Sequence, residues 1–198
     1  MRKLTLADVC VAALPIALPF FSELSLILLG SISLIVLSQV RIPLPFTPVP
    51  ITLQTLGVLL IGLSFGSLRG SVTAAVYIVF GAIGVPAFAG GACGWKHLFG
   101  PTGGYLFGFV AAAWLVGRLA ELRWDRSFWL TFASTMLGTL VIYVFGVAWL
   151  SCFVGIERSL TMGVLPFIPG DIIKALVAAA VLPSVWRLIG TRCGIKNE

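Results

Sequence analysis

The sequence is poor in charged residues. Only 10% of its 198 residues are Asp, Glu, Lys or Arg, whereas 59% are hydrophobic. Soluble domains carry about 25% charged residues, so this chain has too few polar side chains to shield its apolar ones from water. The composition therefore predicts an integral membrane protein. Its apolar runs are continuous rather than alternating, which favours helices over the strands of a transmembrane barrel.

The sequence also has few of the groups on which catalysis and metal binding depend. It contains one histidine, and its four cysteines lie far apart with no CxxC spacing, which argues against a metal site or a disulfide framework. The GxxxxGK[ST] pattern of a phosphate-binding loop is absent, so we expect that the chain does not hydrolyse ATP itself. With no recognisable carboxylate pair or nucleophile arrangement either, we predict a protein that is not an enzyme and needs no cofactor.

What the sequence does contain is a series of apolar segments. A membrane helix needs about 20 residues, and six segments approach or exceed that length. We therefore predict an all-α membrane protein with a bundle of six transmembrane helices in one domain, residues 24–190. Residues 1–23 form an extra N-terminal hydrophobic or interfacial segment, and residues 191–198 form a cytoplasmic tail. The sequence leaves open whether residues 4–21 span the membrane. The six predicted spans are residues 24–40, 51–66, 71–84, 104–120, 128–152 and 170–189.

Basic residues give the predicted orientation. The net charge of +6 comes from residues at the ends of apolar runs, which is typical of topology signals rather than nucleic-acid binding. With the N-terminus inside, nine Lys and Arg residues fall on the inner side and only Arg41, Lys96 and Arg158 on the outer side. The positive-inside rule then predicts a multi-pass plasma-membrane protein with both termini in the cytoplasm.

Two charged residues stand inside the last apolar segment, Asp171 and Lys174. A charge at membrane depth costs about 3 kcal/mol and usually faces protein or a water-filled cavity. Residues three apart on a helix share a face, and we expect this helix to begin at Gly170 or Asp171. Either the pair binds a ligand, or Asp171 caps the helix while Lys174 pairs with it or extends outward.

The loops predicted on the outer side are irregular. The loop of residues 42–50 carries four prolines, so it is stiff, and it serves either as a lid or as a plain connector. The glycine-rich stretch of residues 84–105 cannot form a regular helix, and such backbone is tolerated near membrane depth only where it is buried or lines a cavity. We expect these loops and the charged pair to converge on one face, a tight turn at residues 67–70, and a loop at residues 157–163.

Small residues form two stripes at helical spacing. One comprises Gly104, Gly108 and Ala112, and the other Ala13 and Ala17. Such stripes let another helix approach closely. They are candidate contacts for a partner protein, although they more often pack within the protein itself.

Four motifs resemble, in order and spacing, those of the BioY family, the biotin-specific S components of energy-coupling factor (ECF) vitamin transporters. They are VPITLQTL, GVPAFAGG, GPTGGYL and PGDIIKA, at residues 49–56, 84–91, 100–106 and 169–175. The resemblance implies a six-helix S-component bundle with a biotin pocket near the outer face. It also implies a partner module made of a transmembrane coupling protein and two ATPase subunits. A facilitated-diffusion carrier acting alone, or an S component for another vitamin, remains open.

The resemblance also implies that Asp171 and Lys174 bind the ligand. A carboxylate accepts hydrogen bonds from the ureido N–H groups of biotin, and an ammonium group pairs with the biotin carboxylate; this assignment of ends is a hypothesis. Lys96 and His97 are weaker candidates for the ligand carboxylate. The other predicted substrate-binding residues, from the matching motifs, are Thr52, Gln54, Phe88, Gly90, Gly91 and Tyr105.

Overall fold

Helices make up nearly all the regular structure of the chain, which a computed structural model describes for residues 5–8 and 19–193. The only strands among these residues are β1 (Arg41–Ile42) and β2 (Ile51–Thr52), which pair antiparallel. Two short 3-10 helices, η1 and η2, span Ala89–Gly91 and Trp124–Arg126. The α-helices are α2 (Pro19–Gln39), α3 (Gln54–Phe65), α4 (Ser67–Ala82), α5 (Trp95–Leu98), α6 (Gly103–Glu121), α7 (Phe128–Val154), α8 (Ile156–Gly163) and α9 (Ile168–Cys193).

Four of the described helices, α2, α6, α7 and α9, are long and apolar enough to cross a membrane. The remaining two predicted spans are the shorter apolar helices α3 and α4. At 1.5 Å per residue, these two helices extend about 18 and 24 Å, less than the ~30 Å of a bilayer core. The all-α membrane fold is confirmed, whereas the count of six complete spans stays a prediction.

Two predicted connections were wrong. Residues 67–70 were expected to form a tight turn, but they form the first turn of α4. The chain instead reverses at Gly66, whose φ of +86° suits glycine. Residues 157–163 were expected to form a loop, but most of α8 lies there. Its short charged sequence resembles a loop in hydropathy, although it is an amphipathic helix that buries Ser159 and Gly163.

Two predicted helix starts also differ from the structure. α9 begins at Ile168, before the predicted Gly170, with Pro169 in its first turn, where a missing N–H costs no hydrogen bond. Asp171 lies in that first turn, as expected. α2 begins at Pro19 instead of residue 24. Most of the predicted N-terminal segment and the last residues of the predicted tail lie outside the described residues.

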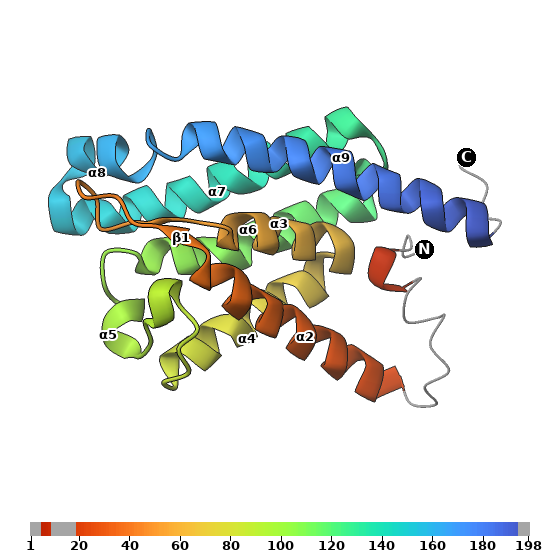
Figure 1. Ribbon diagram of the computed structural model, residues 1–198, viewed down its shortest axis with the longest axis horizontal. Helices are drawn as coiled ribbons and strands as arrows, with labels where there is room; N and C mark the ends of the chain where they lie inside the picture. Colours follow the sequence, from red (N-terminus) through yellow and green to blue (C-terminus); the bar gives the residue numbers. More distant parts are fainter. Residues whose placement is uncertain (1–4, 9–18, 194–198) are drawn as a thin grey trace.

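Helix α6 runs through the middle of the bundle and packs against α3, α4 and α7 (Figure 1). Its close contact with α7 depends on the predicted small-residue stripe. A Cβ on Gly104 would overlap Trp149, and one on Gly108 would lie 3.1 Å from the Ile142 Cα. This stripe therefore packs within the protein, while the one at Ala13 and Ala17 lies outside the described residues.

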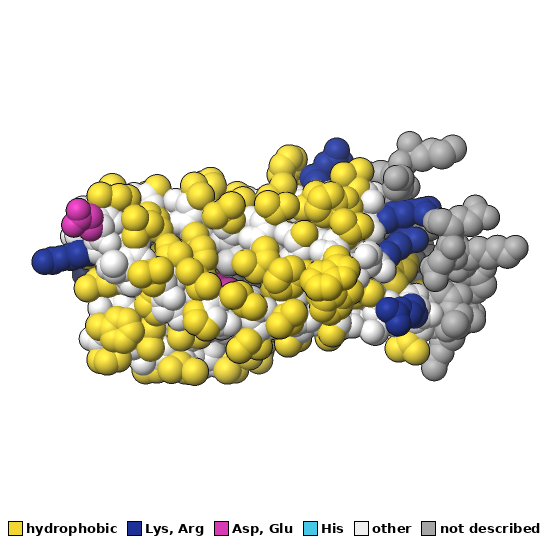
Figure 2. Space-filling view, turned by 90° about the horizontal axis from the view of Figure 1, so that it is seen from above, with side chains coloured by type: hydrophobic (Ala, Val, Ile, Leu, Met, Phe, Trp, Pro, Cys, Tyr) yellow, Lys and Arg dark blue, Asp and Glu magenta, His cyan; other side chains and the backbone are white. Residues whose placement is uncertain are grey.

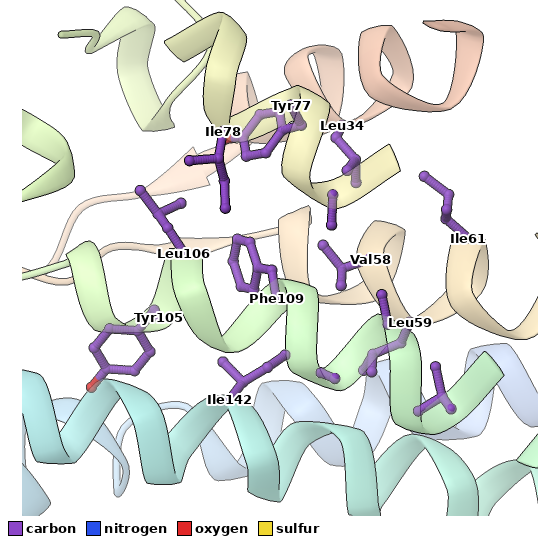
Figure 3. Packing of buried hydrophobic residues seen from close by; sticks show 14 of the residues in the cluster. Leu34, Val58, Leu59, Ile61, Tyr77, Ile78, Tyr105, Leu106, Phe109 and Ile142 are labelled. Atoms are coloured by element: carbon purple, nitrogen blue, oxygen red, sulfur yellow. The ribbon is translucent and has the colours of Figure 1, made fainter. Parts of the chain in front are cut away.

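The core lies between these helices. Figure 3 shows side chains from α2, α3, α4, α6 and α7 meeting there, among them Leu34, Val58, Ile78, Phe109 and Ile142. Apolar side chains also cover the middle of the outer surface, while Lys and Arg gather toward the ends (Figure 2). An apolar belt between charged ends is the surface that a membrane-spanning protein presents.

A buried polar contact fastens α9 near its C-terminal end. The Trp186 indole N–H donates to the Asp125 carboxylate in η2, and the Arg126 guanidinium lies 4.2 Å from the Trp186 ring centroid. Burial raises the pKa of Asp125 to about 6, although the hydrogen bond from Trp186 opposes this. The contact holds α9 against the connection between α6 and α7.

Candidate ligand-binding cavity

A cavity of about 160 Å³ is lined by loop residues and by residues of the adjoining helices. These loops lie at the end of the bundle that carries α5 and α8 (Figure 1). A single water needs only about 10–15 Å³, so the space suits an organic molecule. The proline-rich loop contributes residues 48–50, the glycine-rich stretch contributes Phe88, Ala89 and His97, and α9 contributes the charged pair. The predicted convergence of these three elements is confirmed. Because residues 48–50 line the cavity, the proline-rich loop forms part of its wall.

Most of the predicted substrate-binding residues meet in this cavity. Gly90 and Gly91 do not line it, and they lie in η1, beside the lining residue Ala89. That these residues bind a ligand stays a prediction, but all except the two glycines line the same cavity. The predicted residues that line the cavity are Thr52, Gln54, Phe88, Tyr105, Asp171 and Lys174.

The charged pair forms a buried ion pair. The Lys174 Nζ lies 2.7 Å from one carboxylate oxygen of Asp171 and 2.8 Å from the Thr55 hydroxyl. The Tyr143 hydroxyl donates to the other carboxylate oxygen. The two charged side chains are only 4% and 11% exposed, so water contributes little to balancing them. Both charges are therefore compensated within the protein, by groups from α3, α7 and α9.

A second polar network lies in the cavity wall, around Gln54. The Gln54 amide donates to the Tyr77 hydroxyl, which in turn donates to the Ala87 carbonyl at 3.1 Å. The Thr52 hydroxyl lies 3.3 Å from the Gln54 carbonyl oxygen. A buried amide needs such partners. The network ties the start of α3 to α4 and to the glycine-rich stretch, which sets the position of Phe88.

Aromatic rings complete the wall. Phe88 stacks on His97 with ring centroids 5.1 Å apart. Burial lowers the pKa of His97 below its usual value, which disfavours the charged form of its imidazole. Tyr105 is held by a 2.9 Å hydrogen bond from its hydroxyl to the Gly163 carbonyl, which links α6 to the end of α8. Tyr105 is thus fixed by a contact outside the cavity, whereas Phe88 packs on another ring of the cavity wall.

Four polar lining residues were missed by the sequence analysis: Arg41, Thr55, Thr102 and Tyr143. Tyr143 lies within the long apolar helix α7, which carries several other hydroxyl side chains, so nothing in the sequence singled it out. Arg41 was treated only as a topology signal. Its guanidinium occupies the space that a Cβ at Gly90 would need, so Gly90 contributes by leaving room for Arg41. Arg41 lies on the predicted outer side, where basic residues are rare, and this position could have indicated a role beyond topology.

The helical membrane fold and the cavity among its loops together define a multi-pass membrane protein that holds a small ligand near one end of the bundle. Known proteins with these features are similar to this chain. The crystal structure of the S-component for biotin from an ECF-type ABC transporter matches with a TM-score of 0.76 and 29% identity, covering 84% of this chain and 92% of that one.

Sequence comparisons agree with this match. The model of the BioY family matches residues 7–191. A probable biotin transporter BioY of Pyrococcus horikoshii is 39% identical over 142 residues, which cover 71% of this chain and 83% of the relative. The biotin transporter BioY of Thermotoga maritima is 39% identical over 157 residues, which cover 79% of this chain and 92% of the relative. The chain belongs to the BioY family, and the predicted S-component fold is confirmed.

The ion pair yields a prediction about stability without ligand. Removing one partner of a buried pair leaves the other charge uncompensated, which costs about 3–5 kcal/mol. Asp171→Asn and Lys174→Met should therefore each lower the thermal unfolding temperature of the purified, ligand-free protein. The double variant should lose less than the sum of the two losses, because it leaves no unpaired charge.

The control for this cycle is Arg158→Gln, which changes an exposed arginine of α8 and should leave the unfolding temperature nearly unchanged. Strictly additive losses in the Asp171 and Lys174 variants would show that the two side chains do not depend on each other.

Proposed function

We propose that this protein captures biotin in the cavity at the outer end of its bundle and delivers it across the membrane. The observation that carries the proposal is the convergence of Thr52, Gln54, Asp171 and Lys174 on one cavity. Membership of a family whose relatives are named biotin transporters supports the ligand. The structural likeness to an S-component for biotin supports the mode of action.

The chemistry of the cavity suits biotin. Biotin has an apolar bicyclic body, a ureido group that donates and accepts hydrogen bonds, and a carboxylate tail. Ligand pockets combine apolar walls with a few placed polar groups, and here Phe88 and Phe109 supply apolar surface beside Asp171. We assign Asp171 to the ureido N–H groups. For Lys174 to meet the biotin carboxylate, as hypothesised above, the ligand has to compete with Asp171 for its ammonium group.

This proposal predicts saturable binding. Radiolabelled biotin should bind the purified protein at nanomolar to micromolar concentration, and a large excess of thiamine or riboflavin should not displace it. The physical reason is that the buried polar groups of the cavity match the ureido ring, and a ligand that leaves them unpaired loses affinity. Absence of saturable biotin binding would refute the proposal. Displacement by another vitamin would favour an S component for that vitamin.

We further propose that transport uses an ECF coupling protein and two ATPase subunits, because the solved relative is a component of an ECF-type ABC transporter. The chain carries no phosphate-binding loop of its own. In a host that lacks its own transporter, biotin uptake should therefore be faster when the module is expressed together with this chain than with the chain alone. The cells should then also accumulate biotin. Equal uptake by the chain alone, without accumulation, would support facilitated diffusion.

We propose that the cavity faces outward and that both termini are cytoplasmic, because basic residues are more frequent at the opposite end. Cys93 is an exposed residue in the glycine-rich stretch. In a variant with no other cysteine, a membrane-impermeant maleimide should label it in intact cells. A matched variant with its one cysteine at Leu122→Cys, an exposed position after α6, should react only after permeabilisation. The reverse pattern would invert the topology.

A further inference from the structure

The cavity wall contains three basic side chains, Arg41, His97 and Lys174, and they differ in how their charge is balanced. Lys174 is paired with Asp171 at 2.7 Å. Burial of His97 lowers its pKa and disfavours its charged form, and its ring stacks on Phe88. Arg41 contributes a guanidinium group to the wall. Within the part of the chain that the structure describes, Arg41 forms no ion pair.

The position of Arg41 is set by its backbone. Arg41 lies in β1, opposite Thr52 of β2, so the short ladder holds it at the point where the proline-rich loop starts. Its side chain extends to the glycine-rich stretch, where Gly90 has a φ of +73° and no Cβ to obstruct the guanidinium. Arg41 thus extends from one loop to the other at the cavity wall, and it is exposed, whereas Asp171 is buried.

We propose that Arg41 binds the carboxylate of the ligand and makes the site selective for an anionic ligand over its neutral analogue. This inference rests on the proposed function and adds the residue that recognises the acid group. The buried Asp171–Lys174 pair is neutral as a whole, and it serves the polar ring at the inner end of the cavity. The planar fork of Arg41 then meets the carboxylate at the exposed end, where a bidentate contact is possible.

The geometry favours Arg41 over Lys174 for this role. A carboxylate that approached Lys174 would also approach Asp171, whose oxygen lies 2.7 Å from the same ammonium group. Two carboxylates that approach the same ammonium group repel each other. Beside Arg41 the ligand would meet no such competitor among the described residues. An unpaired guanidinium at a cavity wall is therefore the better partner for an anion.

The test compares biotin with its methyl ester, which lacks the negative charge. Arg41→Gln should weaken the binding of biotin roughly 10- to 100-fold, the usual size of a lost hydrogen-bonded charge contact, and should change ester binding by less than about twofold. Arg41→Lys, which keeps the charge but not the fork, should recover part of the loss. The control is Arg158→Gln, an exposed arginine on the same predicted side that does not line the cavity, which should change neither affinity.

Other outcomes would overturn the inference. If Arg41→Gln reduced the binding of both ligands equally, or of neither, Arg41 would not recognise the carboxylate. A selective loss of biotin in Lys174→Met but not in Arg41→Gln would assign the carboxylate to Lys174. Wild-type protein that failed to bind biotin at all would remove the proposed function together with this inference. If the wild type bound biotin and the Arg41→Gln variant bound it equally tightly, only the inference about Arg41 would fail.

Discussion

The buried ion pair between Asp171 and Lys174 is the constraint on which the cavity depends. Two opposite charges buried inside a membrane protein are tolerable only if each is compensated. Here the compensation comes from three helices, because Thr55 of α3 and Tyr143 of α7 bond to the pair on α9. The same contacts that neutralise the charges therefore hold three helices around a common space.

The helices that surround the cavity are packed closely against one another. Glycines of α6 let its backbone contact the backbone of α7. The hydrogen bond from Trp186 to Asp125 holds α9 near its C-terminal end. At the cavity end, the connecting segments are irregular and rich in glycine and proline. They cannot fill the space as side chains of regular helices do. The cavity is thus bounded by tightly packed helices and covered by loops whose backbone is held by specific hydrogen bonds.

Charge is divided between two depths of this cavity. The inner pair is neutral as a whole and presents hydrogen-bonding groups, which suits an uncharged polar ring. The outer guanidinium of Arg41 is unpaired among the described residues and suits an anion. A ligand with a ureido ring and a carboxylate tail has these two features at opposite ends. The proposed function would use this division of charge to select one small molecule with few chemical groups.

Composition and local pattern determined much of this protein. The low charge established a helical membrane protein, four motifs in order indicated the family, and helix periodicity placed Asp171 and Lys174 on one face. Hydropathy did not predict α8, because its charged residues resemble a loop. It also misplaced the turn before α4, because one glycine is enough to reverse the chain.

Only the tertiary structure decided which groups compensate the buried charges and which charge remains unpaired. The partners of Asp171 and Lys174 on α3 and α7, and the room that Gly90 leaves for Arg41, come from segments far apart in the chain. Hydropathy and periodicity are properties of consecutive residues, so they indicate where a helix lies and which face is apolar. The balance of a charge depends on neighbours in space, and those neighbours are set by packing.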